Sequence, residues 1–423
     1  MPKKLVIFII LLTLFSLAIR LFRIGEPDHY YFDEVYHVVT ARAYANNEPA
    51  AYDPFSPPPE EGTAYDWLHP PLAKLIQAAS IKIIGDKPFA WRLPSVIFGT
   101  ALVPATFILA FLLFGSTVAV FAALVIAFEN LTLVMSRITM NDIFLTFFVV
   151  CSFVFAYLYT LKRSTKNLLL TAIFLGFAVA TKWPGLYAIA VVFGFVMLCD
   201  FREKRLNFKP LLLIIIPTLM YFGSYSQYFL QGRSIDEFIG LHQQIWWYQN
   251  RSDLSHSYGT TALFCTPNGL DTEKSWCPWV LNIRGVYFSY EGYGSENAGY
   301  IYALGNPIVF WLGIVATSYV VGKFVQRRSM KILLILLGYF IFWLPWIFTP
   351  RLLFLYHYLP SIPFLAIVLG YEFRDIYHSK FKFVAIFLMA VIAIAFLYFF
   401  PISTGWPIEV SSIDRFMWLR TWR

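Results

Sequence analysis

Residues 383–400 read FVAIFLMAVIAIAFLYFF, a run of apolar residues with no charged side chain. Lys380 and Lys382 stand just before it. A helix of roughly 20 apolar residues crosses the hydrocarbon core of a bilayer, and cations in short loops favour the cytoplasmic side. The run therefore predicts a membrane-spanning helix that begins at the cytoplasmic face.

Similar apolar runs recur along the whole chain. Two of them, Leu168–Thr181 and Pro184–Cys199, are short and form either two spans or one re-entrant hairpin. The set predicts an all-α polytopic membrane protein with about 11 transmembrane helices. The runs are Leu5–Leu21, Trp91–Phe114, Val118–Met135, Ile143–Leu161, Leu168–Thr181, Pro184–Cys199, Leu211–Leu230, Pro307–Gly322, Ile332–Phe348, Leu352–Tyr371 and Phe383–Phe400.

Composition supports this class. The 423 residues are 58% hydrophobic and 14% charged, whereas soluble chains have roughly 45–50% apolar and about 25% charged residues. An ordinary soluble enzyme, a disordered chain and a secreted disulfide scaffold are thereby excluded. Leu5–Leu21 is interpreted as the first span rather than a signal peptide, because the stretch Arg20-Leu-Phe-Arg23, and no small-residue cleavage motif, stands at its end.

The charge distribution gives an orientation. With the N-terminus inside, short inner loops carry most cations, and the outer side has two long segments, 22–90 and 231–306, and the tail 401–423. The net charge of +8 is explained by this asymmetry, so no nucleic-acid binding is predicted. The inner cations are Lys162, Arg163, Lys166, Arg202, Lys204, Arg205, Lys209, Lys323, Arg327, Arg328, Lys331, Arg374, Lys380 and Lys382.

Ionisable residues beside the spans concentrate on the predicted outer side. Such residues are costly near lipid and indicate function by default. They are Asp33, Glu34, His69, Lys74, Arg92, Arg137, Asp142, Lys182, His256, Arg351 and His357.

Two carboxylates, Asp33 and Glu34, lie in an aromatic stretch shortly after the first span. Desolvation and mutual repulsion raise carboxyl pKa values, which suits a general base that takes a proton from a hydroxyl. The alternative is that they solvate a loop or cap a helix.

A second polar group is Asp66-Trp-Leu-His69-Pro-Pro-Leu-Ala-Lys74. It is either functional or the flank of a helix that starts at Pro70. No tight two-histidine spacing supports a metal site, so we predict no metal and no cofactor.

Four outer cations, Arg92, Arg137, Lys182 and Arg351, either neutralise a phosphate or snorkel to the headgroups. The chain has no P-loop and no dinucleotide motif. Because nucleotide donors are cytosolic, a donor on the outer side is expected to be carried by a lipid.

Cys265 and Cys277 flank a turn-like stretch in the second outer segment. They either form a disulfide or stay as two free thiols.

Seven motifs, in order from Arg20 to about Tyr371, resemble those of the protein O-mannosyltransferases. Ala73 replaces the family's usual Gly, and Ile138 stands where Tyr is expected. The motifs are Phe-Asp33-Glu34-Val-Tyr-His, Asp66-Trp-Leu-His69-Pro-Pro-Leu-Ala-Lys74, Ala-Trp-Arg92-Leu-Pro, Glu129-Asn130 with Ser136-Arg137 and Asn141-Asp142, Thr-Lys182-Trp-Pro-Gly-Leu, His256-Ser-Tyr258, and Leu344-Pro-Trp346 with Arg351 to Pro360.

The resemblance implies a GT-C fold and metal-free, inverting transfer of mannose from polyprenyl or dolichyl phosphate mannose to Ser or Thr hydroxyls of proteins. It implies that Asp33 is the general base and that Glu34 orients acceptor or sugar. Donor phosphate or sugar binding then falls to His69, Lys74, Arg92, Arg137, Lys182, Arg351 and His357. Acceptor or loop roles fall to Asp66, Asp142, His256 and Tyr258.

The resemblance also implies three regions: a catalytic membrane module in residues 1–230, an outer loop in 231–306, and a C-terminal membrane region with an outer tail in 307–423. Eukaryotic members carry a β-trefoil domain in the second main outer loop. The roughly 75 residues here are about half a typical domain, so a compact prokaryotic member in the plasma membrane, among membrane lipids, is expected.

Two other functions stay open. One is a lipid-carrier glycosyltransferase that modifies a glycolipid, as aminoarabinose transferases do, because fold does not decide the acceptor. The other is a transporter or channel. The mid-bilayer parts of the runs carry almost no charge and no inverted repeat is found, which disfavours transport.

Overall fold

The chain folds into a mostly helical protein in a computed structural model, which describes residues 1–205, 207–251, 278–349 and 353–423. Two compact units divide it. Unit 1 comprises residues 1–23, 96–137 and 255–423, and unit 2 comprises residues 24–95 and 138–254. The long helix α4 (Pro88–Phe114) begins in unit 2 and continues in unit 1.

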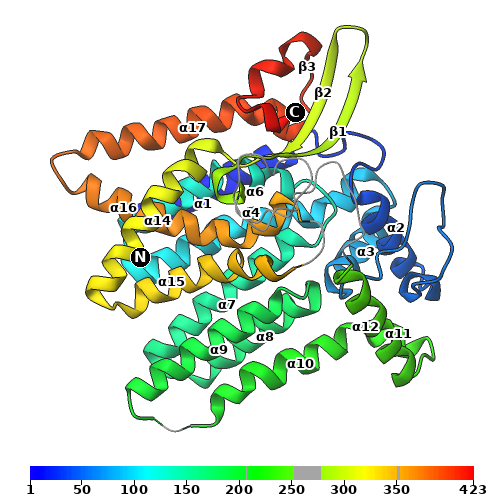
Figure 1. The fold of residues 1–423 in the computed structure, drawn as a ribbon, viewed down its shortest axis with the longest axis horizontal. Helices are drawn as coiled ribbons and strands as arrows, with labels where there is room; N and C mark the ends of the chain where they lie inside the picture. Colours follow the sequence, from blue (N-terminus) through cyan, green and yellow to red (C-terminus); the bar gives the residue numbers. More distant parts are fainter. Residues whose placement is uncertain (206, 252–277, 350–352) are drawn as a thin grey trace. The chain divides into compact units, whose positions relative to one another are not determined.

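Helices and a small sheet form unit 1 (Figure 1). α16 packs along α5, and Gly370 makes this approach close: a Cβ there would meet the Val118 carbonyl oxygen at 2.7 Å. The elements, besides α4, are α1 (Lys3–Leu21), α5 (Ser116–Ala127), α6 (Asn130–Met135), α13 (Pro278–Leu281), β1 (Val286–Tyr293), β2 (Asn297–Ala303), α14 (Pro307–Arg327), α15 (Met330–Ile341), α16 (Ile362–Tyr377), α17 (Lys382–Thr404) and β3 (Ile408–Glu409).

The sheet of unit 1 has the order β1-β2-β3, with antiparallel neighbours. The apolar runs predicted no strand in the second outer segment. A hairpin signal was nevertheless present, because two tyrosine-rich stretches flank a turn at Gly294, which has a positive φ. The tail folds back beside this hairpin and the end of α17 (Figure 1), where the Trp422 indole donates to the Asn282 carbonyl oxygen at 2.6 Å.

Four helices of unit 2, α7 to α10, lie side by side (Figure 1). A chain of hydrogen bonds joins the end of α8 to α10 and α12: the Trp183 indole donates to the Tyr221 hydroxyl (3.1 Å), which lies 2.7 Å from His242 Nε2. The elements are α2 (Glu34–Ala45), α3 (Leu72–Ile84), α7 (Asp142–Lys162), α8 (Thr165–Thr181), α9 (Gly185–Arg202), α10 (Leu212–Ser224), α11 (Ser226–Leu230) and α12 (Ile235–Gln249).

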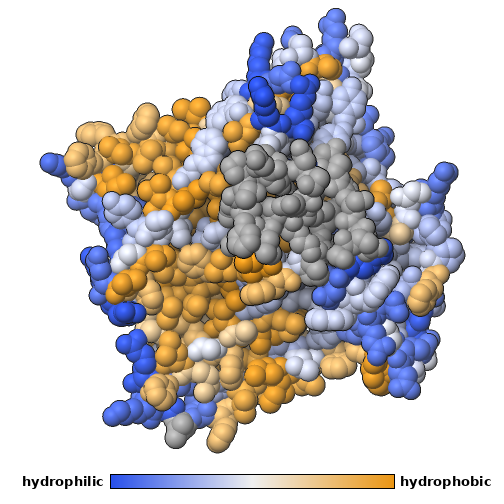
Figure 2. Space-filling view, in the orientation of Figure 1, coloured by the Kyte–Doolittle hydropathy of each residue, from blue (hydrophilic) through white to orange (hydrophobic). Residues whose placement is uncertain are grey.

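Each predicted apolar run overlaps a helix within the described residues, although the run Leu352–Tyr371 is α-helical only from Ile362. Among the described residues, seven helices are long and apolar enough to cross a membrane, and α5, α8 and α10 are shorter apolar helices. Figure 2 shows hydrophobic surface over α14 and α15 in one unit and over α8 to α10 in the other. The protein is a multi-pass integral membrane protein, and its all-α fold class is confirmed apart from the small sheet.

Several runs are interrupted for local reasons. Val118–Met135 splits into α5 and α6 because the Glu129 carboxylate accepts hydrogen bonds from the Leu131 and Thr132 N–H groups and so starts a new helix. α16 begins only at Ile362, after a 3₁₀ segment that contains Pro360. Polar capping and proline, rather than hydrophobicity, therefore set these helix boundaries.

Basic loops that were predicted to lie on one side do meet within each unit. In unit 2, Arg163 after α7 pairs with Asp200 at the end of α9. In unit 1, Lys323 near the end of α14 pairs with Glu372 (2.7 Å) near the end of α16. Each unit therefore has one end at which basic loops gather.

Candidate active site

The residue Asp33 stands at the N-cap position of α2 in unit 2. Its side chain makes no capping hydrogen bond to the helix, although Asp is a preferred N-cap. Phe32, just before it, has a φ of 51°, a left-handed conformation that is unusual for a bulky residue. Such backbone positions cluster at functional sites, because surrounding structure must hold them in place.

The Asp33 residue is half-buried in unit 2. Burial raises the pKa of its carboxyl group to about 6. The charges of His37 and Lys182 oppose this rise, whereas those of Asp66 and Asp142 add to it. Within the described residues, no hydrogen bond or ion pair engages this side chain. A carboxylate that is ionised at neutral pH and uncommitted to a partner can accept a proton.

Asp66 and Lys74 form a buried ion pair in unit 2. Their Oδ2 and Nζ atoms lie 2.7 Å apart, and His37 Nδ1 lies 3.1 Å from the same carboxylate oxygen. Although burial raises the pKa of Asp66, the Lys74 ammonium holds it well below the usual range, and a hydrogen bond from the His37 ring lowers it further. Asp66 is therefore a permanent anion at neutral pH.

His69 lies in the same polar group, with its ring centroid 6.3 Å from that of His37. Burial lowers the pKa of His69 to about 3. Its imidazole is consequently neutral under physiological conditions. A neutral ring can donate one hydrogen bond and accept another, but it adds no positive charge.

Lys182 and Asp142 form a further pair, with 2.8 Å between Nζ and Oδ1 and both side chains buried. Lys182 follows α8 directly, and Asp142 is the first residue of α7. A cation at a helix C-terminus and an anion at a helix N-terminus are both favourable. These two helices thus bring an ammonium group within electrostatic range of Asp33.

Glu34 and Arg92 form an inaccessible two-point ion pair, with Nε–Oε1 at 2.9 Å and Nη2–Oε2 at 2.8 Å. The remaining guanidinium donors reach the backbone carbonyl oxygens of Ile24, Pro27 and His29 at 2.8–3.1 Å. All five N–H donors of Arg92 are thereby used. Glu34 also accepts from the Thr139 N–H at 3.1 Å.

Replacement of Lys74 by Met is expected to lower the free energy of unfolding by about 2–3 kcal/mol, because the Asp66 charge stays buried with only His37 and His69 nearby. The depressed pKa of Asp66 means that its pairing stabilises the fold above its unfolded-state pKa and is lost as pH falls below it. The deficit should therefore shrink in acid. Denaturant titration of the purified protein against pH measures this, with the exposed Lys82→Met on the same helix as control. An equal loss in both variants would contradict it.

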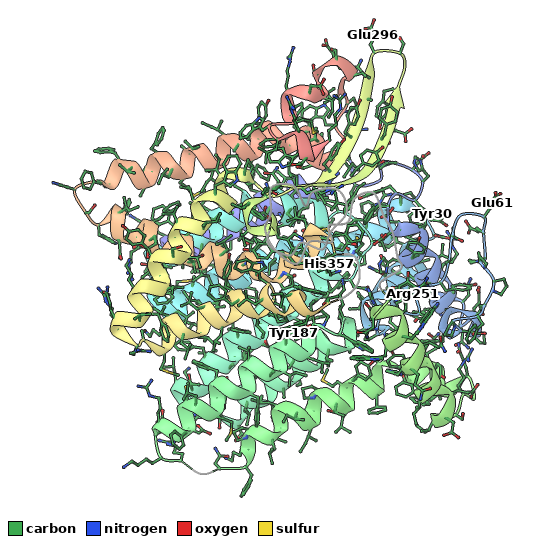
Figure 3. All side chains as sticks on the ribbon, viewed as in Figure 1. Tyr30, Glu61, Tyr187, Arg251, Glu296 and His357 are labelled. Carbon is green, nitrogen blue, oxygen red and sulfur yellow. The ribbon has the colours of Figure 1, made fainter. Side chains whose placement is uncertain are left out.

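Two candidates lie in unit 1 rather than in unit 2. Arg137 is buried and donates to the Arg20 carbonyl oxygen (2.8 Å) at the end of α1 and to that of Thr404 (3.3 Å) at the end of α17. His357, labelled in Figure 3, is buried among aromatic rings, stacked on Trp279 with centroids 6.1 Å apart. Arg137 has the contacts of a cation at two helix C-termini.

Five residues with a predicted site role or disulfide lie outside the described residues. They are Arg351, His256, Tyr258, Cys265 and Cys277.

Family models match both halves of the chain. Residues 10–230 match the model described as dolichyl-phosphate-mannose-protein mannosyltransferase. Residues 234–422 match the C-terminal four-transmembrane region of protein O-mannosyltransferase. The chain belongs to the protein O-mannosyltransferase family.

Relatives within this family are bacterial and fungal. A polyprenol-phosphate-mannose–protein mannosyltransferase of Corynebacterium glutamicum is 26% identical over 84% of this chain and 81% of its own length. The Mycobacterium tuberculosis protein of that name is 23% identical over 98% of this chain and 91% of its own. A Saccharomyces cerevisiae dolichyl-phosphate-mannose–protein mannosyltransferase is 30% identical over 44% of this chain and 24% of its own.

Solved structures share the fold. The S. cerevisiae protein O-mannosyltransferase Pmt1–Pmt2 complex bound to its sugar donor superposes with a TM-score of 0.80 at 16% identity, covering 100% of this chain and 93% of the other. ArnT from Cupriavidus metallidurans, bound to undecaprenyl phosphate, gives 0.63 at 14% identity, covering 94% and 65%. At these identities the likeness establishes the GT-C fold of the family and nothing finer.

His37 belongs to the polar group, although the motifs did not single it out. Its spacing was informative, because His37 follows Asp33 by one helical turn and its N–H bonds to the Asp33 carbonyl oxygen at 3.0 Å. No three acidic, Cys or His side chains are arranged for a metal within the part of the chain that the structure describes.

Proposed function

We propose that this chain transfers mannose from polyprenyl phosphate mannose to Ser or Thr hydroxyls of proteins, with Asp33 as the general base. Its membership of the mannosyltransferase family and its bacterial relatives named for this donor support the substrate class. The observation that carries the assignment of the base is an uncommitted carboxylate with a pKa of about 6, within electrostatic range of the Lys182 ammonium group.

The chemistry is a single displacement. The acceptor oxygen forms a bond to the anomeric carbon of mannose, and the bond from that carbon to the phosphate oxygen breaks. Asp33 takes the proton from the acceptor hydroxyl, and the electron pair leaves with the polyprenyl phosphate. Attack on the face opposite the leaving group inverts the anomeric centre.

The leaving phosphate gains negative charge in this step, so a preorganised cation lowers the barrier. Lys182 is a cation within electrostatic range of Asp33, which supports this role. Asp142, 2.8 Å from it, keeps this ammonium group oriented. We assign Lys182 to the donor phosphate and Asp142 to positioning Lys182.

Glu34 and Arg92 act through the backbone rather than on the substrate. Because the donors of Arg92 are all used inside the protein, none is free for a phosphate in this arrangement. The pair ties residues 24–29 and Thr139 to the start of α2. We therefore assign it to holding Asp33 in place, in contrast to the substrate contacts that the resemblance implied.

The direction of α7 supports an extracytoplasmic site. Asp142 begins this 21-residue helix and Lys162 ends it, beside the basic loop, so the two ends are about 30 Å apart. Basic loops lie on the cytoplasmic side of membrane proteins. The Asp33 group is accordingly assigned to the outer face, in the plasma membrane of a prokaryote.

Mannose transfer in proteoliposomes tests this function. The purified protein would receive labelled polyprenyl phosphate mannose and either a Ser/Thr peptide, the same peptide with Ala at every Ser and Thr, or a glycolipid acceptor. Label is expected only on the hydroxyl-bearing peptide. Label on the glycolipid alone would overturn the proposal in favour of a lipid-modifying transferase.

The pH dependence of transfer should report Asp33. The reactive carboxylate is present above its pKa, so kcat/KM is expected to fall about tenfold per pH unit below pH 6 and to be flat above pH 7. Initial rates with limiting donor across this range measure the profile. An acid limb near the ordinary pKa of Asp, two units lower, would contradict the assignment.

A further inference from the structure

An open cavity of about 400 Å³ lies in unit 1, at the end where its basic loops gather. It is lined by the end of α4, the connection from α14 to α15, and the end of α16. Charge patterning predicts that this end is cytoplasmic. The cavity belongs to unit 1, whereas the Asp33 group belongs to unit 2.

Three cations line this cavity: Arg327, Lys331 and Arg374. Arg327 and Lys331 are exposed, and neither forms an ion pair within the described residues. The Arg374 guanidinium stacks over the Tyr371 ring at 4.1 Å, which fixes its plane at the cavity wall. Such a group of cations is complementary to a phosphate.

Neighbouring carboxylates do not cancel these charges. Asp375 accepts from Arg374 at 2.6 Å and from Lys323 at 2.9 Å, and Glu372 accepts from Lys323 at 2.7 Å. Lys323 is outside the cavity lining, and its positive charge compensates one of these two carboxylates. The cavity keeps an excess of positive charge.

Apolar residues form the rest of the lining. Leu113 and Ile332 are buried, and Leu112 and Phe114 are half-buried at the end of α4. The nearby surface of α14 and α15 is hydrophobic, with Val325 57% exposed (Figure 2). The acyl chains of a lipid can lie along this surface and cover the apolar lining. A free phosphate ion would leave that lining exposed to water.

We propose that this cavity binds the anionic headgroup of a phospholipid from the cytoplasmic leaflet. Basic pockets between transmembrane helices on this side suit phosphate-bearing headgroups. Ser329, which also lines the cavity, does not cap the N-terminus of α15 with its side chain, so N–H groups of the first turn are available as further donors.

Lipid binding to the purified protein tests the site. The probes are phosphatidylglycerol, phosphatidylcholine with the same acyl chains, and inorganic phosphate, each titrated and read by native mass spectrometry. Arg327→Ala combined with Lys331→Ala is expected to weaken phosphatidylglycerol binding roughly 20- to 30-fold, since each cation near an anionic lipid contributes about fivefold. Phosphatidylcholine should bind weakly to every form.

Arg328→Asn is the matched control. Arg328 is adjacent and exposed but does not line the cavity, and its left-handed backbone (φ 51°) tolerates Asn. It should change binding less than threefold. An equal loss in the control would indicate diffuse attraction and overturn the proposal, as would saturable binding of inorganic phosphate that displaces the lipid.

Folding is checked separately. The melting temperature of the double variant should match that of wild type, and mannose transfer in phosphatidylcholine vesicles should be retained. If the double variant does not fold, Lys331→Gln alone should weaken phosphatidylglycerol binding about fivefold. Wild-type affinity in Lys331→Gln would also overturn the site.

Discussion

Replacing Asp33 with Asn is expected to lower the rate of mannose transfer by about 10²–10⁴-fold, the usual contribution of a general base. Asn keeps the size of the side chain but cannot take a proton. The affinity for polyprenyl phosphate mannose should stay within a few-fold of wild type. Steady-state transfer to a Ser/Thr peptide, together with donor binding, measures both quantities.

The same variant should be no less stable than wild type. A raised pKa means that ionised Asp33 is disfavoured in the folded protein at neutral pH. Neutral Asn removes this cost, so the melting temperature is expected to stay constant or to rise. Loss of activity without loss of stability is the pattern of a functional residue, because active sites retain groups that folding alone would not favour.

Asp28→Asn serves as the control for that experiment. Asp28 lies in the same loop, five residues earlier, and its side chain is almost fully exposed. Full activity is expected. Wild-type rates in both variants would remove Asp33 from the role of base, and a parallel fall in donor affinity in Asp33→Asn would point to donor binding instead.

The helices could be predicted from sequence because the hydrocarbon core of a bilayer offers the backbone no hydrogen-bond partners. A run such as Phe383–Phe400 must satisfy its N–H and C=O groups internally, so hydrophobicity alone indicates a helix. Interruptions could not be predicted this way. Glu129 ends one helix region and starts α6 through two hydrogen bonds to its own N-terminus, which depend on local geometry.

The candidate site was predictable in its residue types but not in its pairings. Asp33 and Lys182 stood out as ionisable groups beside spans, and Asp66 stood out in the second polar group. The depressed pKa of Asp66 depends on Lys74, eight residues away on a different segment, at 2.7 Å. The sequence shows which side chains are ionisable, whereas tertiary packing determines which partner each of them pairs with.

Arg92 illustrates the limit of residue type as a guide. Arginine at the outer end of a span suits a phosphate, and the family resemblance implied that role. The carbonyl oxygens of Ile24, Pro27 and His29 take up its remaining donors, and nothing in the sequence shows that they converge there. The position of these three backbone groups is the reason that we propose a positioning role for Arg92 rather than phosphate binding.

Replacing Arg92 with Ala is expected to lower the free energy of unfolding by about 3–5 kcal/mol, because Glu34 keeps a buried charge without its partner. Arg92 and Glu34 are both inaccessible to solvent, and their atoms meet at 2.8 and 2.9 Å. Arg92→Lys should also destabilise the protein, since an ammonium group cannot reproduce the two-point contact. Denaturant titration in mixed micelles measures each variant.

A double-mutant cycle separates positioning from substrate binding. Glu34→Gln removes the charge that Arg92→Ala leaves unpaired, so the two losses should not add, with a coupling of about 1–3 kcal/mol. If the pair holds Asp33, folded Arg92→Lys should show a lower kcat with the KM for polyprenyl phosphate mannose within a few-fold of wild type. Wild-type stability in Arg92→Ala with a strongly raised KM for the donor would instead place the guanidinium on the phosphate. The two readouts differ because a positioning residue acts on the reacting carboxylate, whereas a binding residue acts on the affinity for the donor.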